Sequence, residues 1–284
     1  MAATLEPPRA GLSGAVEPAD RAPAGDRLAR ILAPALIALL VLLGWEAVVR
    51  LNDIPHYILP GPSLVARELV YSWPVLWPSL LITVKIAALA LLAAILGGVG
   101  LALLCSLSRW IEISLFPYAV VLQVTPVVSI APLILIYVDN TLTAVVLCAW
   151  IVAFFPILSN TMLGLASADH NLRDLFELYG ASRWQQLRLL RLPTALPYFL
   201  GGLRIAGGLS LIGAVVAEYV AGTAGTGTGL AFRVLEAQYR LNIPRMFAGL
   251  FLLALTGVAI YLLFGALSHL LLHRWHESAV RRER

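Results

Sequence analysis

Long apolar runs constrain the fold of this chain more than any other feature. Six runs are each long enough to form a helix that crosses about 30 Å of hydrocarbon, which takes roughly 17–25 residues. We predict spans at Ile31–Val49, Leu80–Leu104, Ile113–Val138, Leu142–Leu165, Tyr198–Ala221 and Phe247–Leu272. Because 60% of the 284 residues are hydrophobic and only 13% are charged, the composition excludes an ordinary soluble domain. The sequence therefore predicts an all-α polytopic membrane protein with about six transmembrane helices.

The distribution of arginine predicts how these spans are oriented. If the N-terminus lies inside, thirteen arginines fall in cytoplasmic segments and five fall on the opposite side. An excess of positive charge marks the cytoplasmic side, so we expect both termini and the charged segment after the fourth span in the cytoplasm. The net charge of +4 is explained by this topology. We expect no nucleic-acid partner, because no basic stripe is interleaved with aromatic residues.

The apolar runs also divide the chain into parts. Residues 1–30 are rich in Ala, Pro and Gly, which predicts a disordered cytoplasmic tail. Residues 31–50 are expected to form a retained anchor helix, since their apolar run exceeds the roughly 7–15 residues of a signal-peptide core. A periplasmic segment is expected at 51–78, a five-helix core at 79–272 and a basic cytoplasmic C-terminus at 273–284.

A charged island, Asn171–Pro197, interrupts the core between the fourth and fifth spans. It predicts two short amphipathic helices that are hinged at Gly180 and stopped by the prolines at 193 and 197. The apolar face of the first helix has the spacing i, i+3, i+4, i+7. This face consists of Leu172, Leu175, Phe176 and Tyr179. Ser182 and Gln185 have the spacing of a capping box, which predicts that the second helix begins there.

Two interpretations of this island follow from the residues alone. One is a polar interhelical loop that lies on lipid headgroups. The other is a cytoplasmic hairpin, at about residues 170–193, to which another protein binds. A resemblance to a known family bears on this choice.

The island resembles the cytoplasmic loop of permease subunits from bacterial ATP-binding-cassette importers, in particular the nitrate/sulfonate/taurine branch. That loop has the form E-A-A-x3-G-x9-I-x-L-P. Here Gly180 is followed at the same offsets by Leu190, Leu192 and Pro193, whereas Asp174-Leu175-Phe176 replaces Glu-Ala-Ala. The resemblance extends from Leu59 to about residue 276.

This resemblance implies a type I importer fold and a coupling helix within the hairpin, which docks on a separate ATPase. The residues expected to couple to the ATPase are Asp174, Leu175, Phe176, Glu177, Gly180, Ala181, Ser182, Arg183, Leu190 and Pro193. The implied partners are a second copy of the chain, a cytoplasmic ATPase dimer and a periplasmic or lipid-anchored substrate-binding protein. The implied mechanism is alternating access of the dimer to the two sides of the membrane, driven by ATP, and the implied location is the inner membrane of a bacterium.

The chain itself lacks the G-x-x-x-x-G-K-[ST] phosphate loop. Its Gly/Thr-rich stretch around Gly222, Gly225, Gly227 and Gly229 is not followed by Lys-Ser/Thr, so we interpret it as a loop. ATP and Mg are therefore expected on the partner ATPase, and no catalytic residue or cofactor is expected here. His269, His273 and His276 share a helical face, but we interpret them as a helix end that suits His rather than as a metal site.

The third span indicates a solute pathway. Pro117, Pro126 and Pro132 interrupt it, and a helix broken near mid-membrane exposes backbone groups that transporters use for substrates. A kink that serves only packing is the alternative. We expect the pathway or gate residues to be Gln123, Thr125, Pro126, Ser129 and, near the outer end of the fifth span, Glu218. For Glu218 the alternative is a plain interfacial carboxylate.

A secondary, ion-coupled transporter and a non-catalytic membrane scaffold remain as alternative functions. An ion-coupled transporter needs a carboxylate at mid-bilayer, whereas Glu46, Glu112 and Asp139 lie near predicted span ends. The resemblance implies a small solute of the nitrate/sulfonate/taurine class or a pyrimidine- or flavin-type vitamin precursor. The stretches around Leu241 and Trp275 resemble most the permeases proposed for vitamin precursors.

Overall fold

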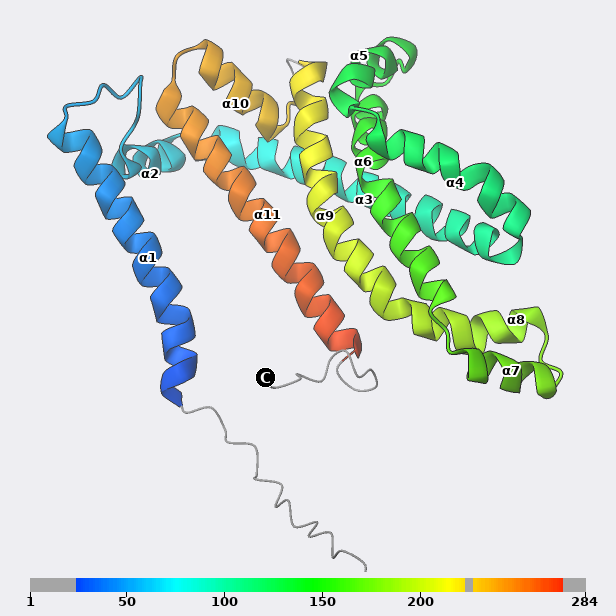
Figure 1. Cartoon of the computed structure of the whole chain (residues 1–284). Helices are drawn as coiled ribbons and strands as arrows, with labels where there is room; N and C mark the ends of the chain where they lie inside the picture. Colours follow the sequence, from blue (N-terminus) through cyan, green and yellow to red (C-terminus); the bar gives the residue numbers. More distant parts are fainter. Residues whose placement is uncertain (1–23, 223–226, 273–284) are drawn as a thin grey trace, which may run out of the picture. The chain divides into compact units, whose positions relative to one another are not determined.

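The computed structural model describes the backbone of residues 24–222 and 227–272, with side chains from residue 32 onward. These ranges are all helical apart from turns and connecting segments (Figure 1). The helices are α1 (Ala24–Leu51), α2 (Pro62–Tyr71), α3 (Trp73–Leu107), α4 (Arg109–Val124), α5 (Val127–Tyr137), α6 (Thr141–Ala166), α7 (His170–Leu178), α8 (Arg183–Gln186), the π-helical turn η1 (Leu187–Arg191), α9 (Leu192–Ala221), α10 (Leu230–Tyr239) and α11 (Ile243–Leu272). The predicted tail up to residue 23, Gly225 and the C-terminal segment 273–284 lie outside the described residues.

Five helical segments are long and apolar enough to cross a membrane. They are Leu32–Leu51, α3, Arg183–Ala221, α6 and α11, and the bent pair α4–α5 raises the number to six if it forms one span. The predicted all-α membrane fold with about six spans is therefore confirmed.

The chain divides into an N-terminal unit, Met1–Asn52, and a larger unit, Asp53–Arg284. The N-terminal unit contains α1, which begins at Ala24 and includes the last residues of the predicted tail. Its candidate span, Leu32–Leu51, buries none of its side chains. One polar contact on it joins Arg50 to Glu46 at 2.6 Å.

The core of the larger unit is α6 packed between α3 and α9 (Figure 1). Glycines allow these helices to approach closely. A Cβ atom at Gly98 would meet Ile157 at 2.8 Å, and one at Gly202 would meet the carbonyl oxygen of Pro156 at 2.7 Å. The neighbouring Gly201 faces open space, so only part of the glycine pattern of α9 serves packing.

The third predicted span, Ile113–Val138, is not one straight helix. It breaks between α4 and α5, and the two halves are bent by 102°. Pro126 has no backbone N–H and cannot continue the helical hydrogen bonds, so α4 ends and α5 begins at this point. The hydroxyl of Thr125 donates to the carbonyl oxygen of Val121 at 2.7 Å, which satisfies one acceptor at the broken end. The predicted interruption is therefore present as a sharp bend.

Two other boundaries differ from the prediction. The second span begins at Trp73 instead of Leu80, so the predicted segment 51–78 contains α2 and the first turn and a half of α3. The prolines at 193 and 197 do not stop the second helix of the island, because α8 continues through η1 into α9. A π-helical turn shifts the hydrogen bonds by one residue and so removes the need for the missing N–H of Pro193.

Candidate functional site

The helical hairpin α7–α8 protrudes from one end of the larger unit, below α6 and α9 in Figure 1. We call this end of the unit the hairpin end. The carboxylate of Asp169 caps α7 by accepting the N–H of Asn171 at 2.7 Å. At the other end of α7, Gly180 has φ +66, and the N–H of Ala181 donates to the carbonyl oxygen of Phe176 at 2.9 Å. This is a Schellman ending, so the predicted left-handed Gly180 is confirmed.

The capping box predicted for the second helix is also present. The backbone N–H of Gln185 donates to the Ser182 hydroxyl at 3.3 Å, and the Gln185 amide oxygen accepts the N–H of Ser182 at 2.7 Å. The turn between α7 and α8 is therefore closed by bonds from both helices. Leu187 and Leu190 are buried and anchor the base of the hairpin.

The predicted coupling residues have different environments in this hairpin. Asp174, Leu175, Glu177, Gly180, Ser182 and Arg183 are exposed; Phe176, Ala181 and Pro193 are half-buried; Leu190 is buried. Prediction from the sequence missed Leu178 and Trp184, which lie off the apolar stripe. Leu178 is 84% exposed, Tyr179 82% and Trp184 65%, so three large hydrophobic side chains protrude at the tip. The sequence did contain a signal for Leu178 and Trp184, because they are large apolar residues in an otherwise polar segment.

Four of the five predicted pathway or gate residues, Gln123, Thr125, Pro126 and Ser129, lie where α4 bends into α5. Gln123, Thr125 and Pro126 line a cavity of about 380 Å³ together with Ile151 and Leu209. Ser129 is exposed but is not part of the lining. The structure thus places three of the five predicted residues on one cavity.

Glu218 lies apart from that cavity, at the end of the unit opposite the hairpin, and it is only 4% exposed. Its carboxylate accepts the hydroxyl of Thr83 at 2.7 Å and the N–H of Ala231 at 2.9 Å. The Thr83 hydroxyl in turn accepts the N–H of Leu230 at 2.8 Å. Glu218 therefore caps the N-terminus of α10 and ties it to α3 and α9, which a plain interfacial carboxylate would not do.

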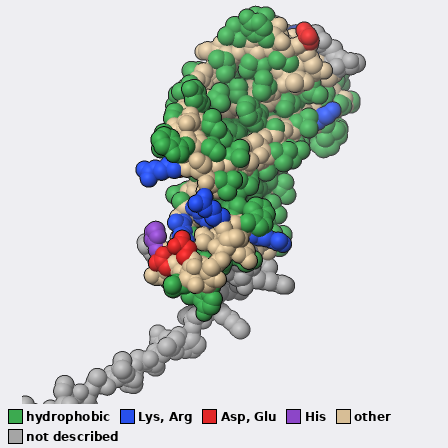
Figure 2. Space-filling model, turned by 90° about the vertical axis from the view of Figure 1, so that its right-hand side faces the viewer, with side chains coloured by type: hydrophobic (Ala, Val, Ile, Leu, Met, Phe, Trp, Pro, Cys, Tyr) green, Lys and Arg blue, Asp and Glu red, His purple; other side chains and the backbone are tan. Residues whose placement is uncertain are grey.

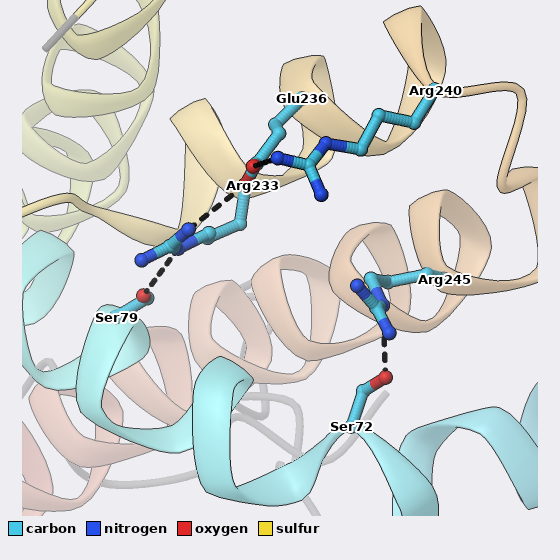
Figure 3. Close-up of polar contacts among 6 residues, drawn as sticks. All are labelled: Ser72, Ser79, Arg233, Glu236, Arg240 and Arg245. Atoms are coloured by element: carbon cyan, nitrogen blue, oxygen red, sulfur yellow. Dashed lines mark hydrogen bonds and ion pairs between the residues drawn. The ribbon is translucent and has the colours of Figure 1, made fainter. Parts of the chain in front are cut away.

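Arginines at this opposite end attach α10 and α11 to α3 (Figure 3). Arg233 donates to the Ser79 hydroxyl at 3.3 Å and pairs with Glu236 at 2.8 Å. Arg245 donates to the Ser72 hydroxyl at 2.9 Å. The first turns of α3 are thus held by two different helices.

Within the described residues, no three His, Cys, Asp or Glu side chains gather in a way that would hold a metal ion. His273 and His276 of the predicted histidine face lie outside the described residues. A bent helix beside a cavity, among helices long and apolar enough to cross a membrane, is typical of membrane transport proteins.

The chain belongs to the family described as binding-protein-dependent transport system inner membrane component, which matches residues 94–282. It is 38% identical over 242 residues to the riboflavin transport system permease protein RibX of Chloroflexus aurantiacus, with 84% of this chain and 88% of that protein covered. It is 34% identical over 240 residues to a probable ABC transporter permease protein of Haemophilus influenzae, with 84% and 96% covered. It is 32% identical to the formylaminopyrimidine transport permease protein ThiX of Halalkalibacterium halodurans, with 85% and 95% covered.

The fold also matches a solved structure described as an amino acid ABC transporter with histidines. The TM-score is 0.58 at 21% sequence identity, and 71% of this chain and 94% of that chain are covered. The protein is therefore a multi-pass inner-membrane permease of an ATP-binding-cassette importer for small solutes and is not the catalytic subunit. A binding-protein-dependent system implies an ATPase and a substrate-binding protein as its partners.

Proposed function

We propose that the α7–α8 hairpin is the surface through which the ATPase drives this permease. The observation that carries the proposal is the exposed apolar tip formed by Leu178, Tyr179 and Trp184. Large exposed apolar side chains on a rigid support are typical of a protein interface. The Schellman ending at Gly180 and the capping box at Ser182 fix the shape of the tip, so little conformational entropy is lost on docking.

The hairpin is also well placed to transmit a movement. It continues without interruption through η1 into α9, the helix that packs along α6. A displacement of α8 by the ATPase is therefore passed directly to a core helix. We place the hairpin, and both termini, in the cytoplasm on the basis of the arginine distribution.

The matched test uses two tyrosines of nearly equal exposure at opposite ends of the larger unit. Tyr179 on the hairpin is 82% exposed and Tyr239 at the end of α10 is 79% exposed. Tyr179→Asp should abolish copurification with the ATPase subunit while the permease remains in the membrane at normal abundance. Tyr239→Asp should leave copurification unchanged. If Tyr179→Asp copurifies as well as the unaltered chain, the hairpin is not the docking surface.

We propose that two copies of the chain form the pathway. The bent pair α4–α5 leaves Val121, Val128 and Ile136 more than half exposed. The cavity beside Gln123 is lined by residues of α4, α5 and α6, by the two residues between α4 and α5, and by Leu209 of α9. A second copy would cover this apolar surface and close a pathway between the subunits. Mass photometry of the purified transporter should give a mass with two permease subunits. A mass with one permease subunit would contradict this arrangement.

For the solute we propose a heteroaromatic vitamin precursor of the flavin or pyrimidine type. Identity is 38% to the riboflavin permease and 32% to the formylaminopyrimidine permease, against 27% to a sulfonate permease named SsuC and 30% to a taurine permease named TauC. Calorimetry on the substrate-binding protein of the same system tests this, with riboflavin, formylaminopyrimidine and taurine as ligands. Tight binding of taurine alone would overturn the assignment and would leave the ATP-driven permease function intact.

A further inference from the structure

A second and larger cavity lies at the hairpin end of the larger unit, away from the bend of α4–α5. Its volume is about 720 Å³, within the range of ligand sites in proteins. It is enclosed by the last turn of α3, the first half of α4, the last turns of α6 and the π-helical turn η1. Neither the apolar tip of the hairpin nor the cavity beside Gln123 includes any of its lining residues.

Positive charge predominates in the lining of this cavity. Arg109 and Arg191 contribute two positive charges and Glu112 one negative charge, which leaves +2 − 1 = +1. None of the ion pairs in the described part of the chain involves these three residues. The Arg191 side chain donates one hydrogen bond, to the carbonyl oxygen of Ser106 at the long distance of 3.4 Å. Most of the donors of both guanidinium groups are therefore free for an anion.

A third arginine adds to this positive field from behind the cavity wall. Arg173 donates from Nη2 to the carbonyl oxygen of Ala166, a lining residue, at 2.8 Å. Its Nε is buried and has no partner among the described residues. Figure 2 shows one face of the molecule, where hydrophobic side chains cover most of the upper part and charged side chains of both signs gather in the lower part.

The remaining wall of the cavity is apolar. It is formed mainly by Ile113, Phe116, Met162 and Leu165. A cavity with guanidinium groups at one side and aliphatic and aromatic side chains at the other fits an anion that carries a hydrocarbon part. It does not fit a small inorganic ion alone, because the apolar wall would then remain exposed to water.

We propose that this cavity binds a phosphate that carries an apolar group, and that the source is an anionic phospholipid of the membrane. The phosphodiester would accept hydrogen bonds from Arg109 and Arg191, and the first part of an acyl chain would lie against Phe116 and Met162. Arginine forms paired hydrogen bonds with phosphate oxygens, and basic pockets between membrane helices bind acidic headgroups. This site is independent of ATPase docking, because it uses none of the exposed residues at the hairpin tip.

The experiment uses the full-length chain, purified in a mild detergent and stripped of lipid. Native mass spectrometry and thermal stability are measured while dioleoylphosphatidylglycerol or dioleoylphosphatidylcholine is added. We expect retention and stabilisation with phosphatidylglycerol and at least about tenfold weaker binding of the zwitterionic lipid. Inorganic phosphate and glycerol phosphate form the soluble arm, and we expect no stabilisation by either at the same concentration.

Variants that remove either a positive or a negative charge from the cavity lining make the test specific. Arg109→Gln and Arg191→Gln should each weaken binding of phosphatidylglycerol about tenfold, whereas Glu112→Gln should strengthen it severalfold because it removes the one negative charge of the lining. Arg183→Gln, an exposed hairpin arginine outside the cavity, is the control and should bind unchanged.

Three results would overturn the proposal. Equal binding of phosphatidylcholine and phosphatidylglycerol would show that charge is not recognised. Unchanged binding in Arg109→Gln and Arg191→Gln would place the lipid elsewhere. Saturation by glycerol phosphate at a similar concentration would assign the site to a soluble anion instead of a lipid.

Discussion

Gly229 and Glu218 offer the sharpest test of how the structure holds α10 in place. A Cβ atom at Gly229 would overlap the carboxylate of Glu218. The backbone at Gly229 has φ −76 and ψ 170, a conformation that any L-residue adopts, so Ala is not excluded by the backbone. The three atoms nearest to such a Cβ all belong to this carboxylate, which therefore has to move in Gly229→Ala.

The size of the effect follows from the hydrogen bonds that the carboxylate would lose. Glu218 is 4% exposed and accepts from Thr83 at 2.7 Å and from Ala231 at 2.9 Å. A hydrogen bond to a charged group contributes about 1.5–3 kcal/mol, and partial retention in a shifted position reduces the sum. We expect Gly229→Ala to destabilise the protein by about 2–4 kcal/mol.

The effect of Gly229→Ala on stability should change sign when the Glu218 carboxylate is absent. Glu218→Ala alone leaves the N–H of Ala231 without this acceptor and leaves the Thr83 hydroxyl only the long bond to the Ser79 carbonyl oxygen at 3.4 Å, so it should cost about 3 kcal/mol. In that background Gly229→Ala no longer meets the carboxylate, and it restricts the unfolded chain, so it should be neutral or stabilise by up to about 1 kcal/mol. Unfolding by denaturant in mild detergent measures all four members of this cycle. Additive effects of the two substitutions, or a neutral Gly229→Ala in the unaltered chain, would refute the reasoning.

Two further predictions concern the core and the hairpin. Gly202→Ala should destabilise the protein by about 1–3 kcal/mol, because its Cβ would meet a carbonyl oxygen of α6 at 2.7 Å. Gly201→Ala faces open space and should stabilise the protein by roughly 0.5–1 kcal/mol. Thermal unfolding compares the two variants. Equal effects would contradict the packing of α9 on α6. Ser182→Ala should remove one bond of the capping box and cost about 1 kcal/mol of local stability, which hydrogen exchange in α8 measures. Unchanged exchange in α8 would show that the box does not hold the helix.

The number of membrane spans and their helical character could be predicted from the sequence because a span requires an apolar run of fixed length. The positions of the helix starts were predicted less well, and proline explains why. Pro193 was interpreted as a residue that stops a helix, but α8 continues through η1 into α9 across it. Pro74 lies in the first turn of α3, where no N–H is needed, so this helix begins before the apolar run that marks the span.

The details of the hairpin were predictable because they are local. Gly180, Ser182 and Gln185 act on backbone groups within three or four residues, so spacing alone determines the bonds they form. The role of Glu218 was not predictable in the same way. Its partner Thr83 is 135 residues away in the chain, and no periodicity within α9 indicates that the two side chains meet.

Which of two neighbouring glycines packs against another helix could also be decided only from the structure. Gly201 and Gly202 look equivalent in the sequence, yet one faces open space and the other a carbonyl group of α6. Likewise, three prolines interrupt the third span, but only the break at Pro126 produces the bend of 102°. In both cases the outcome depends on which neighbouring helix lies opposite, and that information is not local.

Site-specific crosslinking at the hairpin tip tests the central claim most directly. The chain has two cysteines, Cys105 and Cys148, both buried, and Cys105→Ala with Cys148→Ala removes them. Leu178→Cys in that background, treated with a short thiol-to-amine crosslinker in the assembled transporter, should give an adduct with the ATPase subunit. Tyr239→Cys at the opposite end should give none. A transporter that retains uptake but forms no ATPase adduct through Leu178→Cys, under conditions in which that cysteine is labelled, would contradict the account.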